Sequence, residues 1–212
     1  MSHRLLPIFG GTFDPVHNGH LQCALEVAEW LEEPVALLPS HRPAHRNQPG
    51  ATADQRLEML SEAVRDCPLL TVDDRELRRP GPTYTVDTLS EWRGEAPEAA
   101  FCFIVGQDAF AGLHTWHRWR DLRDLTHFIV ITRPGPRPEL HDELRRWLTR
   151  ATARDLAALA ATQAGQVIFR AVTPLEISAS AIRERIAAGG DPGFLVPTAV
   201  RRLIRDSGLY RR

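Results

Sequence analysis

Two histidines three residues apart, His17 and His20, lie in the stretch GGTFDPVHNGHL, between an apolar run and a helical pattern. A turn at this junction needs one or two glycines, but it does not need imidazole side chains. The first N–H groups of a helix attract anions, and an imidazole beside them can donate a hydrogen bond or carry a positive charge. Either histidine alone could simply cap the helix or pack, and Asn18 is a further capping candidate. The pair at this spacing instead indicates a phosphate site.

A second candidate phosphate site lies in the segment TPLEISASAIRERI. Ser178 and Ser180 begin a helical pattern, and Arg183 follows one turn later. Hydroxyl groups, helix N–H groups and a guanidinium together suit phosphate oxygens, whereas a capped helix with a surface arginine is the structural alternative. The sequence contains no lysine, so all 26 of its Lys+Arg residues are arginine. A phosphate clamp here must therefore use arginine, histidine, backbone N–H groups or a metal.

Two further loops that follow apolar runs could bind an anionic substrate. The loop PSHRPAHRN carries His45 and Arg46, which suit a phosphate monoester or form a solvated basic loop. In RPGPTYTVDTL, Thr83 or Thr85 can cap the next helix, whose first N–H groups attract a carboxylate or a phosphate. Without a ligand, that second segment is an ordinary capped helix.

Other polar and aromatic residues follow the fourth and fifth apolar runs. Asp108, close after Gly106, could accept hydrogen bonds from a ribose or cap a helix. Tryptophan is usually a core residue, but Trp116 and Trp119 lie in the polar stretch HTWHRW, which weakens that expectation. Arg133 ends the fifth run and could reach a phosphate or remain a solvated loop residue.

The elements that position these loops alternate along the chain. Apolar runs predict strands at Leu5–Phe9, Val35–Leu38, Leu69–Val72, Phe101–Val105, Phe128–Thr132 and Val167–Ala171. Helical patterns lie at Gly19–Glu32, Ala53–Arg65, Thr85–Arg93, Glu139–Ala161, Ser178–Ala188 and Pro197–Ser207. Continuous apolar runs are typical of strands buried on both faces of a parallel sheet, with helices covering both faces. The sequence therefore predicts an α/β fold, a Rossmann-like doubly wound parallel sheet in a single domain over residues 1–212, which binds ligands beyond the carboxyl ends of its strands.

Composition narrows the class of protein. The 212 residues are 43% hydrophobic and 25% charged, as in an ordinary soluble globular protein. The net charge of −1 gives no reason to expect a nucleic acid or an acidic membrane as a partner. The three cysteines, Cys23, Cys67 and Cys102, suit neither a disulfide framework nor a zinc site. The sequence shows no leader and no membrane span, so we expect a cytoplasmic protein and leave a homo-oligomer open.

The segments GGTFDPVHNGH and ISASAIR together resemble the paired motifs of the HxGH nucleotidyltransferase superfamily, which moves a nucleotidyl group from a nucleoside triphosphate to a phosphate acceptor. The resemblance implies that His17, His20 and Arg183 are catalytic and stabilise the transferring phosphoryl group without a covalent intermediate. It implies an ATP site formed by Gly10, Gly11, Thr12, Phe13, His17, His20, Gly106, Asp108, Ser178, Ser180 and Arg183.

The middle segments TYTVDTL and GQDAFAGLHTW resemble those of bacterial nicotinate-nucleotide adenylyltransferases. The resemblance implies that backbone amides at Tyr84 and Thr85 receive the carboxylate of a pyridine base, and that Trp116 stacks on its ring. Trp119 is then structural. The implied mononucleotide site consists of His45, Arg46, Tyr84, Thr85, Trp116 and Arg133.

The reaction implied is the transfer of AMP from ATP to nicotinate mononucleotide, which gives deamido-NAD and pyrophosphate. Mg²⁺ would accompany ATP, with no dedicated metal site in the protein. The alternative enzyme is an adenylyltransferase for nicotinamide mononucleotide, because a site that also offers a carbonyl acceptor takes the amide. A non-catalytic nucleotide-binding regulator would be favoured if one of the two histidines were missing. A dinucleotide dehydrogenase is disfavoured because the glycines do not form GxGxxG.

Overall fold

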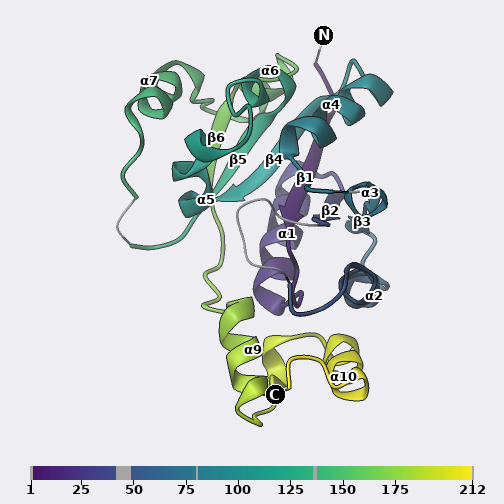
Figure 1. The fold of residues 1–212 in the computed structure, drawn as a ribbon. Coiled ribbons are helices and arrows are strands. Elements are labelled where there is room, and N and C mark those ends of the chain that lie inside the picture. Colours follow the sequence, from purple (N-terminus) through teal and green to yellow (C-terminus); the bar gives the residue numbers. More distant parts are fainter. Residues whose placement is uncertain (1, 42–48, 80, 136–137, 212) are drawn as a thin grey trace.

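A computed structural model describes residues 2–41, 49–79, 81–135 and 138–211, and it shows a parallel sheet covered by helices on both faces (Figure 1). The strands are β1 (Leu5–Gly11), β2 (Val35–Pro39), β3 (Leu70–Val72), β4 (Ala100–Gly106), β5 (His127–Thr132) and β6 (Val167–Ala171). Their order in the sheet is β3-β2-β1-β4-β5-β6, and every neighbouring pair is parallel. The predicted doubly wound fold is confirmed, and all six predicted strands are present.

The larger helices follow the predicted order. They are α1 (Asn18–Leu31), α2 (Ala53–Val64), α4 (Thr85–Glu95), α9 (Ala179–Ala187) and α10 (Thr198–Ser207). Shorter helical segments that the sequence analysis did not predict are α3 (Arg75–Arg78), α5 (Gln107–Ala111), η1 (Leu113–Thr115), α6 (Leu122–Leu125) and η2 (Gly193–Leu195). In the described part of the chain, no helix is long and apolar enough to cross a membrane.

The single helix predicted over Glu139–Ala161 is wrong, because the segment forms two helices, α7 (Asp142–Ala151) and α8 (Leu156–Ala160). Between them, the N–H of Ala153 donates to the carbonyl of Val167 at 2.8 Å, so the chain joins the edge of β6 there. Asp155 then caps α8 by accepting a hydrogen bond from the N–H of Ala158 at 2.8 Å. Helical periodicity does not reveal such a pairing with a distant strand.

Each face of the sheet has its own apolar core. Alternate residues of β4 point to opposite faces, so Cys102 and Ile104 join one core, and Phe101, Phe103 and Val105 join the other. The first core is completed by α1, α2, α9 and α10, and the second by α4, α5, α6 and α7. Burial on both faces explains why the strands are continuous apolar runs in the sequence.

The order of the strands reverses between β1 and β4. From β1 the chain builds outward to β3, and it then returns to β4 on the other side of β1. Loops at the carboxyl ends of these two strands therefore leave in opposite directions, and a crevice at such a point is the usual ligand site of an open parallel sheet. In Figure 1, α9 and α10 lie below the sheet and beyond the end of β6, and α10 packs beside α2.

Candidate active site

The two histidines lie face to face at the start of α1. Their rings stack with centroids 3.6 Å apart and an interplanar angle of 19°. His17 is the N-cap, and its Nδ1 accepts a hydrogen bond from the backbone N–H of His20 at 3.3 Å. Asn18 is the first helical residue instead, and its Nδ2 donates to the carbonyl of Phe194 at 2.6 Å. The prediction that Asn18 caps α1 is therefore wrong, because the imidazole one residue earlier occupies that position.

His17 is kept neutral by its surroundings. It is only 4% exposed, and burial together with the nearby Arg133 guanidinium lowers its pKa to about 4. A neutral imidazole whose Nδ1 accepts a hydrogen bond carries its proton on Nε2. At neutral pH, His17 can therefore donate one hydrogen bond from Nε2 without being charged.

The loop after β1 depends on two glycines. A Cβ on Gly10 would lie 2.7 Å from Cζ of Phe103, and a Cβ on Gly11 would lie 2.9 Å from Cζ of Phe13. Phe13 is 1% exposed, has a φ of 49° and packs edge-on against His20, with ring centroids 5.1 Å apart. Because Gly10 and Gly11 have no Cβ, the rings of Phe103 and Phe13 can pack against the loop backbone. Phe13 also holds the His20 ring in place.

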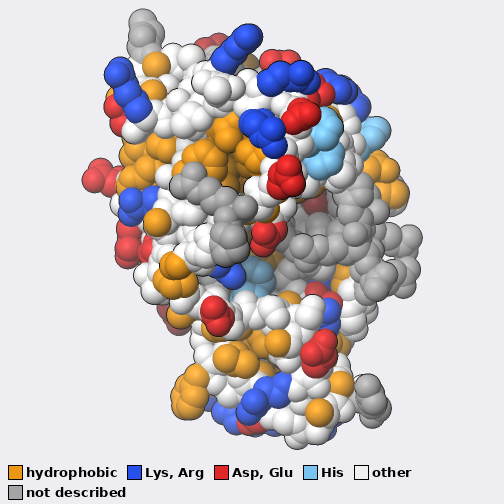
Figure 2. Space-filling view, turned by 90° about the vertical axis from the view of Figure 1, so that its left-hand side faces the viewer, with side chains coloured by type: hydrophobic (Ala, Val, Ile, Leu, Met, Phe, Trp, Pro, Cys, Tyr) orange, Lys and Arg blue, Asp and Glu red, His pale blue; other side chains and the backbone are white. Residues whose placement is uncertain are grey.

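The two phosphate motifs meet at a third glycine. A Cβ on Gly19 would lie 3.1 Å from Nδ1 of His17 and 3.5 Å from Cβ of Ile177, which immediately precedes the cap of α9. The glycine of the HxGH motif is therefore the point of contact with the ISAS segment. In the space-filling view the molecule narrows from a broad upper part to a smaller lower part (Figure 2).

The start of α9 carries the predicted hydroxyl groups. Ser178 is its N-cap and accepts a hydrogen bond from the N–H of Ala181 at 3.2 Å. Ser180 lies in the first turn and accepts from Nη2 of Arg183 at 3.3 Å. Arg183 also crosses to the loop after β1, where its Nη1 donates to the carbonyl of Asp14 at 2.7 Å. Its side chain remains 35% exposed, so part of the guanidinium stays accessible.

Residues at the ends of β4 and β5 lie at the same carboxyl edge of the sheet as the loop after β1. Gly106 ends β4 and is the N-cap of α5, and Asp108 is exposed in the first turn of that helix. Gly106 pairs in register with Ile131 of β5, so the loops after the two strands open side by side. Arg133 follows β5 and interacts with the thiol of Cys23 and with His17. The predicted mononucleotide residue Arg133 therefore lies close to the histidines of α1.

The start of α4 differs from that of α9. Its N-cap is Tyr84, and no side chain caps the helix. The prediction that Thr83 or Thr85 caps α4 is wrong, because the cap position falls between them on a tyrosine, whose hydroxyl lies too far from its own backbone to cap. The first N–H groups of α4 thus lack a side-chain cap, which suits a carboxylate or phosphate ligand.

Aromatic side chains lie beside this helix end. The Tyr84 ring lies 4.4 Å from the ring of His117, centroid to centroid, and the half-buried Trp116 packs edge-on against Phe103 at 6.2 Å. Since Phe103 also covers Gly10, it connects the end of β1 to Trp116. Trp119 is 6% exposed in the core, which confirms that it is structural. The predicted residues His45 and Arg46 lie outside the described part of the chain.

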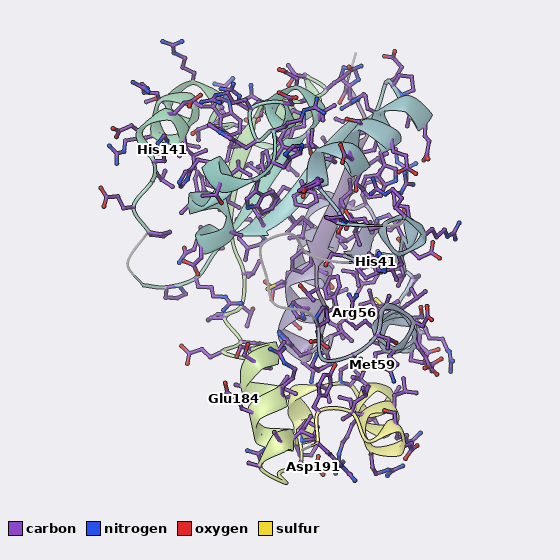
Figure 3. All side chains as sticks on the ribbon, in the orientation of Figure 1. His41, Arg56, Met59, His141, Glu184 and Asp191 are labelled. Carbon is purple, nitrogen blue, oxygen red and sulfur yellow. The ribbon has the colours of Figure 1, made fainter. Side chains whose placement is uncertain are left out.

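Arg56 is a buried arginine that the sequence analysis missed. It is 1% exposed on α2, and its Nη1 donates to the carbonyls of Thr12 at 2.8 Å and Ser40 at 2.6 Å. Its Nη2 donates to the carbonyl of His41 at 3.0 Å. Figure 3 shows Arg56 between His41 and the buried Met59. It joins the loops after β1 and β2, and its place on the apolar face of α2 was the signal that could have identified it.

Among the described residues, no group of three or more His, Cys, Asp and Glu side chains could hold a metal ion. The donors gathered near the end of β1 are imidazole, guanidinium, hydroxyl and backbone N–H groups. Such groups can bind anions, so their chemistry suits phosphate oxygens.

Comparison with known proteins agrees with this geometry. A family model described as cytidylyltransferase-like matches residues 8–185, and the chain belongs to that family. A solved structure of Plasmodium falciparum nicotinic acid mononucleotide adenylyltransferase complexed with NaAD covers 98% of both chains, with a TM-score of 0.75 and 17% identity. It shows the same fold.

Sequence relatives define the group within the family. A protein from Pseudomonas syringae pv. tomato is 48% identical over 210 residues, which cover 98% of this chain and 94% of the relative. A protein from Aeromonas hydrophila subsp. hydrophila is 42% identical over 205 residues, or 96% of each chain. Both are named "Probable nicotinate-nucleotide adenylyltransferase", and this chain belongs with them.

Proposed function

We propose that this protein transfers the adenylyl group of ATP to nicotinate mononucleotide, forming deamido-NAD and releasing pyrophosphate. The observation that carries the proposal is the meeting of the two phosphate motifs at Gly19, with Arg183 reaching the loop after β1. The names of the sequence relatives support the choice of acceptor. Residues 1–212 then form one nucleotidyltransferase domain.

The two substrates would occupy opposite sides of the end of β1. His17, His20 and Arg183 lie on elements of the α1 and α9 face, and they would bind the triphosphate. Tyr84 and Trp116 pack against the core of the α4 and α5 face, and they would bind the mononucleotide. Gly10 and Gly11 lie between the two sets. Phe103 covers Gly10 and contacts Trp116, whereas Phe13 covers Gly11 and contacts His20.

The groups assigned to ATP would work by positioning and by charge stabilisation. An oxygen of the mononucleotide phosphate attacks the α-phosphorus of ATP, and the bond to the leaving pyrophosphate breaks. Negative charge then grows on the pyrophosphate oxygens. Donors fixed in advance at those oxygens lower the barrier most, because they need no reorganisation during the reaction. His17, His20, Arg183 and the N-termini of α1 and α9 supply such donors.

Mg²⁺ would enter with ATP. The anion-binding donors of the described site fit phosphate oxygens and do not fit a bare cation. The ion would therefore be held by triphosphate oxygens and water, as is usual for Mg²⁺ in phosphoryl transfer, and it would neutralise part of their charge.

The start of α4 supports nicotinate as the preferred base. Backbone N–H groups and the positive end of the helix dipole favour a carboxylate over a neutral amide. Trp116 would stack on the pyridine ring. The nicotinamide form would be preferred only if the site also placed a carbonyl acceptor beside the amide nitrogen.

Pyrophosphate release by the purified protein tests the proposal. With ATP and Mg²⁺, we expect release with nicotinate mononucleotide and a much lower kcat/KM with nicotinamide mononucleotide. A preference for nicotinamide mononucleotide would keep the adenylyl transfer and overturn the role assigned to α4. Release with neither mononucleotide would overturn the proposed function.

A further inference from the structure

Asp14 is a buried acid that the proposed reaction does not use. It is 5% exposed, and within the described residues its carboxylate accepts hydrogen bonds from three groups. These are the N–H of Gly50 at 2.8 Å, the N–H of Ala51 at 3.1 Å and the hydroxyl of Tyr210 at 2.7 Å. A buried carboxylate needs such hydrogen-bond partners to offset the loss of water around it. The three donors come from two distant segments, so they hold the carboxylate in one orientation.

Tyr210 is placed specifically for this contact. It lies beyond α10 with a φ of 64°, a conformation that residues with side chains rarely adopt. Its ring lies against Gly50, where a Cβ would come within 3.1 Å of Cδ1 and of Cε1. Burial and the Asp14 carboxylate raise the pKa of the Tyr210 hydroxyl above its ordinary value. The hydroxyl therefore stays protonated and remains a donor at neutral pH.

Asp14 also lies next to Arg183. The Nη1 of Arg183 donates to the Asp14 carbonyl at 2.7 Å, but it is 3.7 Å from Oδ2 of the carboxylate. A direct charge-assisted bond between such groups is about 2.8 Å long. The donors from Gly50, Ala51 and Tyr210 thus hold the carboxylate short of a close pair with Arg183.

We propose that Tyr210 is a positioning residue for ATP: its hydroxyl holds the Asp14 carboxylate away from Arg183, so that the guanidinium stays available to the triphosphate. The inference rests on the proposed function, because it uses Arg183 as an ATP ligand. Without the hydroxyl, Oδ1 of Asp14 keeps the N–H of Ala51 but loses its shortest bond, so the carboxylate is held less firmly and can move from 3.7 Å into a closer pair with Arg183. The ring of Tyr210 has a separate role in packing, which Tyr210→Phe preserves.

The first test compares Tyr210→Phe with the parent protein. We expect the Kd of ATP with Mg²⁺, measured by calorimetry, to rise about tenfold, as the loss of one charge-assisted hydrogen bond predicts. The Kd of nicotinate mononucleotide should stay within about twofold. Ser207→Ala is the matched control, because it removes another hydroxyl, bonded at 2.6 Å to the Leu203 carbonyl of the same helix. It should change neither Kd. Equal weakening of both substrates, or no change in ATP affinity, would overturn the inference.

The second test asks whether Tyr210 acts through Arg183. Arg183→Gln should weaken ATP binding by itself, and adding Tyr210→Phe to it should then change the Kd by no more than about twofold. A tenfold effect that persists in the Arg183→Gln protein would overturn the inference and leave the proposed function intact. If Arg183→Gln left both ATP binding and pyrophosphate release unchanged, the ATP site of the proposed function would fail instead.

Discussion

At the scale of single residues, the two stacked histidines show why the site needs a ligand of high negative charge. Two imidazolium rings with centroids 3.6 Å apart would repel each other, and burial already keeps His17 neutral. The negative charge of a triphosphate beside the rings would stabilise a protonated imidazole and so oppose the effect of burial. His17 is therefore a neutral hydrogen-bond donor in the folded protein, and a bound triphosphate would favour its protonation.

We predict that His17→Asn lowers kcat about a hundredfold with little loss of stability, a size typical of losing one donor to a developing oxyanion. Asparagine is a good N-cap, so α1 keeps its first hydrogen bond. His141→Asn is the matched control, because His141 is also an N-cap histidine and accepts from the N–H of Glu143 at 3.3 Å. Steady-state pyrophosphate release and urea unfolding measure both variants. Near-normal turnover of His17→Asn would show that His17 is only a cap.

Residue types and spacing suffice to propose the phosphate-binding side chains, because each motif is local in the sequence. Arg56 and Asp14 could not be assigned a role in the same way. The partners of Arg56 are the carbonyls of Thr12, Ser40 and His41, and backbone groups leave no mark in a sequence. Arg56 does share one face of α2 with Met59 and Leu60, and a charge among apolar positions of a helix is a detectable signal.

At the scale of elements, α4, the helix that begins beside the predicted pyridine site, lacks the side-chain cap that α2 and α9 have, as α10 also does. Thr52 and Gln55 form a full capping box on α2, and Ser178 caps α9, whereas the N-cap Tyr84 of α4 makes no side-chain cap hydrogen bond. Leaving this end without a side-chain cap gives up roughly 1 kcal/mol of helix stability. The free N–H groups gained are the ones we assign to the carboxylate.

Thr85→Pro tests this assignment at small cost to the fold. Proline is favoured at the first position of a helix, and Tyr84 before it has φ −118° and ψ 132°, which a following proline permits. The substitution removes one N–H group. We expect the KM for nicotinate mononucleotide to rise about tenfold, with the KM for ATP unchanged.

Asp142→Pro is the control for Thr85→Pro, because Asp142 is the first residue of α7, after a cap residue with ψ 141°. Both variants should melt close to the parent protein by circular dichroism, and only Thr85→Pro should affect the mononucleotide. If Thr85→Pro binds nicotinate mononucleotide normally, the N–H of Thr85 does not hold the carboxylate.

The sequence predicted strands more reliably than helix ends. Strands buried on both faces, such as β4 and β5, are continuous apolar runs, and their predicted limits lie within one residue of those observed. The break between α7 and α8 depends on pairing of Ala153 with Val167 of β6, which no local pattern encodes. The caps of α1 and α4 were likewise mispredicted. The geometry of the preceding loop decides which side chain reaches the end of a helix, and the local sequence does not reveal that geometry.

At the scale of the whole molecule, two buried histidines, one in the candidate site and one in the core, make the stability of the fold depend on pH. His127 is fully buried in β5, where its Nε2 donates to the carbonyl of Thr162 at 2.9 Å and its Nδ1 accepts from the N–H of Gln166 at 3.1 Å. The second bond requires the neutral ring, because a protonated Nδ1 cannot accept a hydrogen bond. Burial lowers the pKa of His127, as it lowers that of His17 to about 4. The folded chain therefore resists protonation at both positions.

We predict that acid destabilises the fold below about pH 6.5, the ordinary pKa of histidine. Between that pH and about 4, the unfolded chain binds protons that the folded chain does not, so the free energy of unfolding falls as the pH falls. His17 accounts for about 3 kcal/mol of this loss, and His127 adds to it in the same direction. Urea unfolding of the parent and of His17→Asn, at about pH 7 and about pH 4.5, measures the effect. The variant has no titrating group at position 17, so its stability should fall less on acidification. Equal losses in the two proteins would show that His17 is protonated in the folded state.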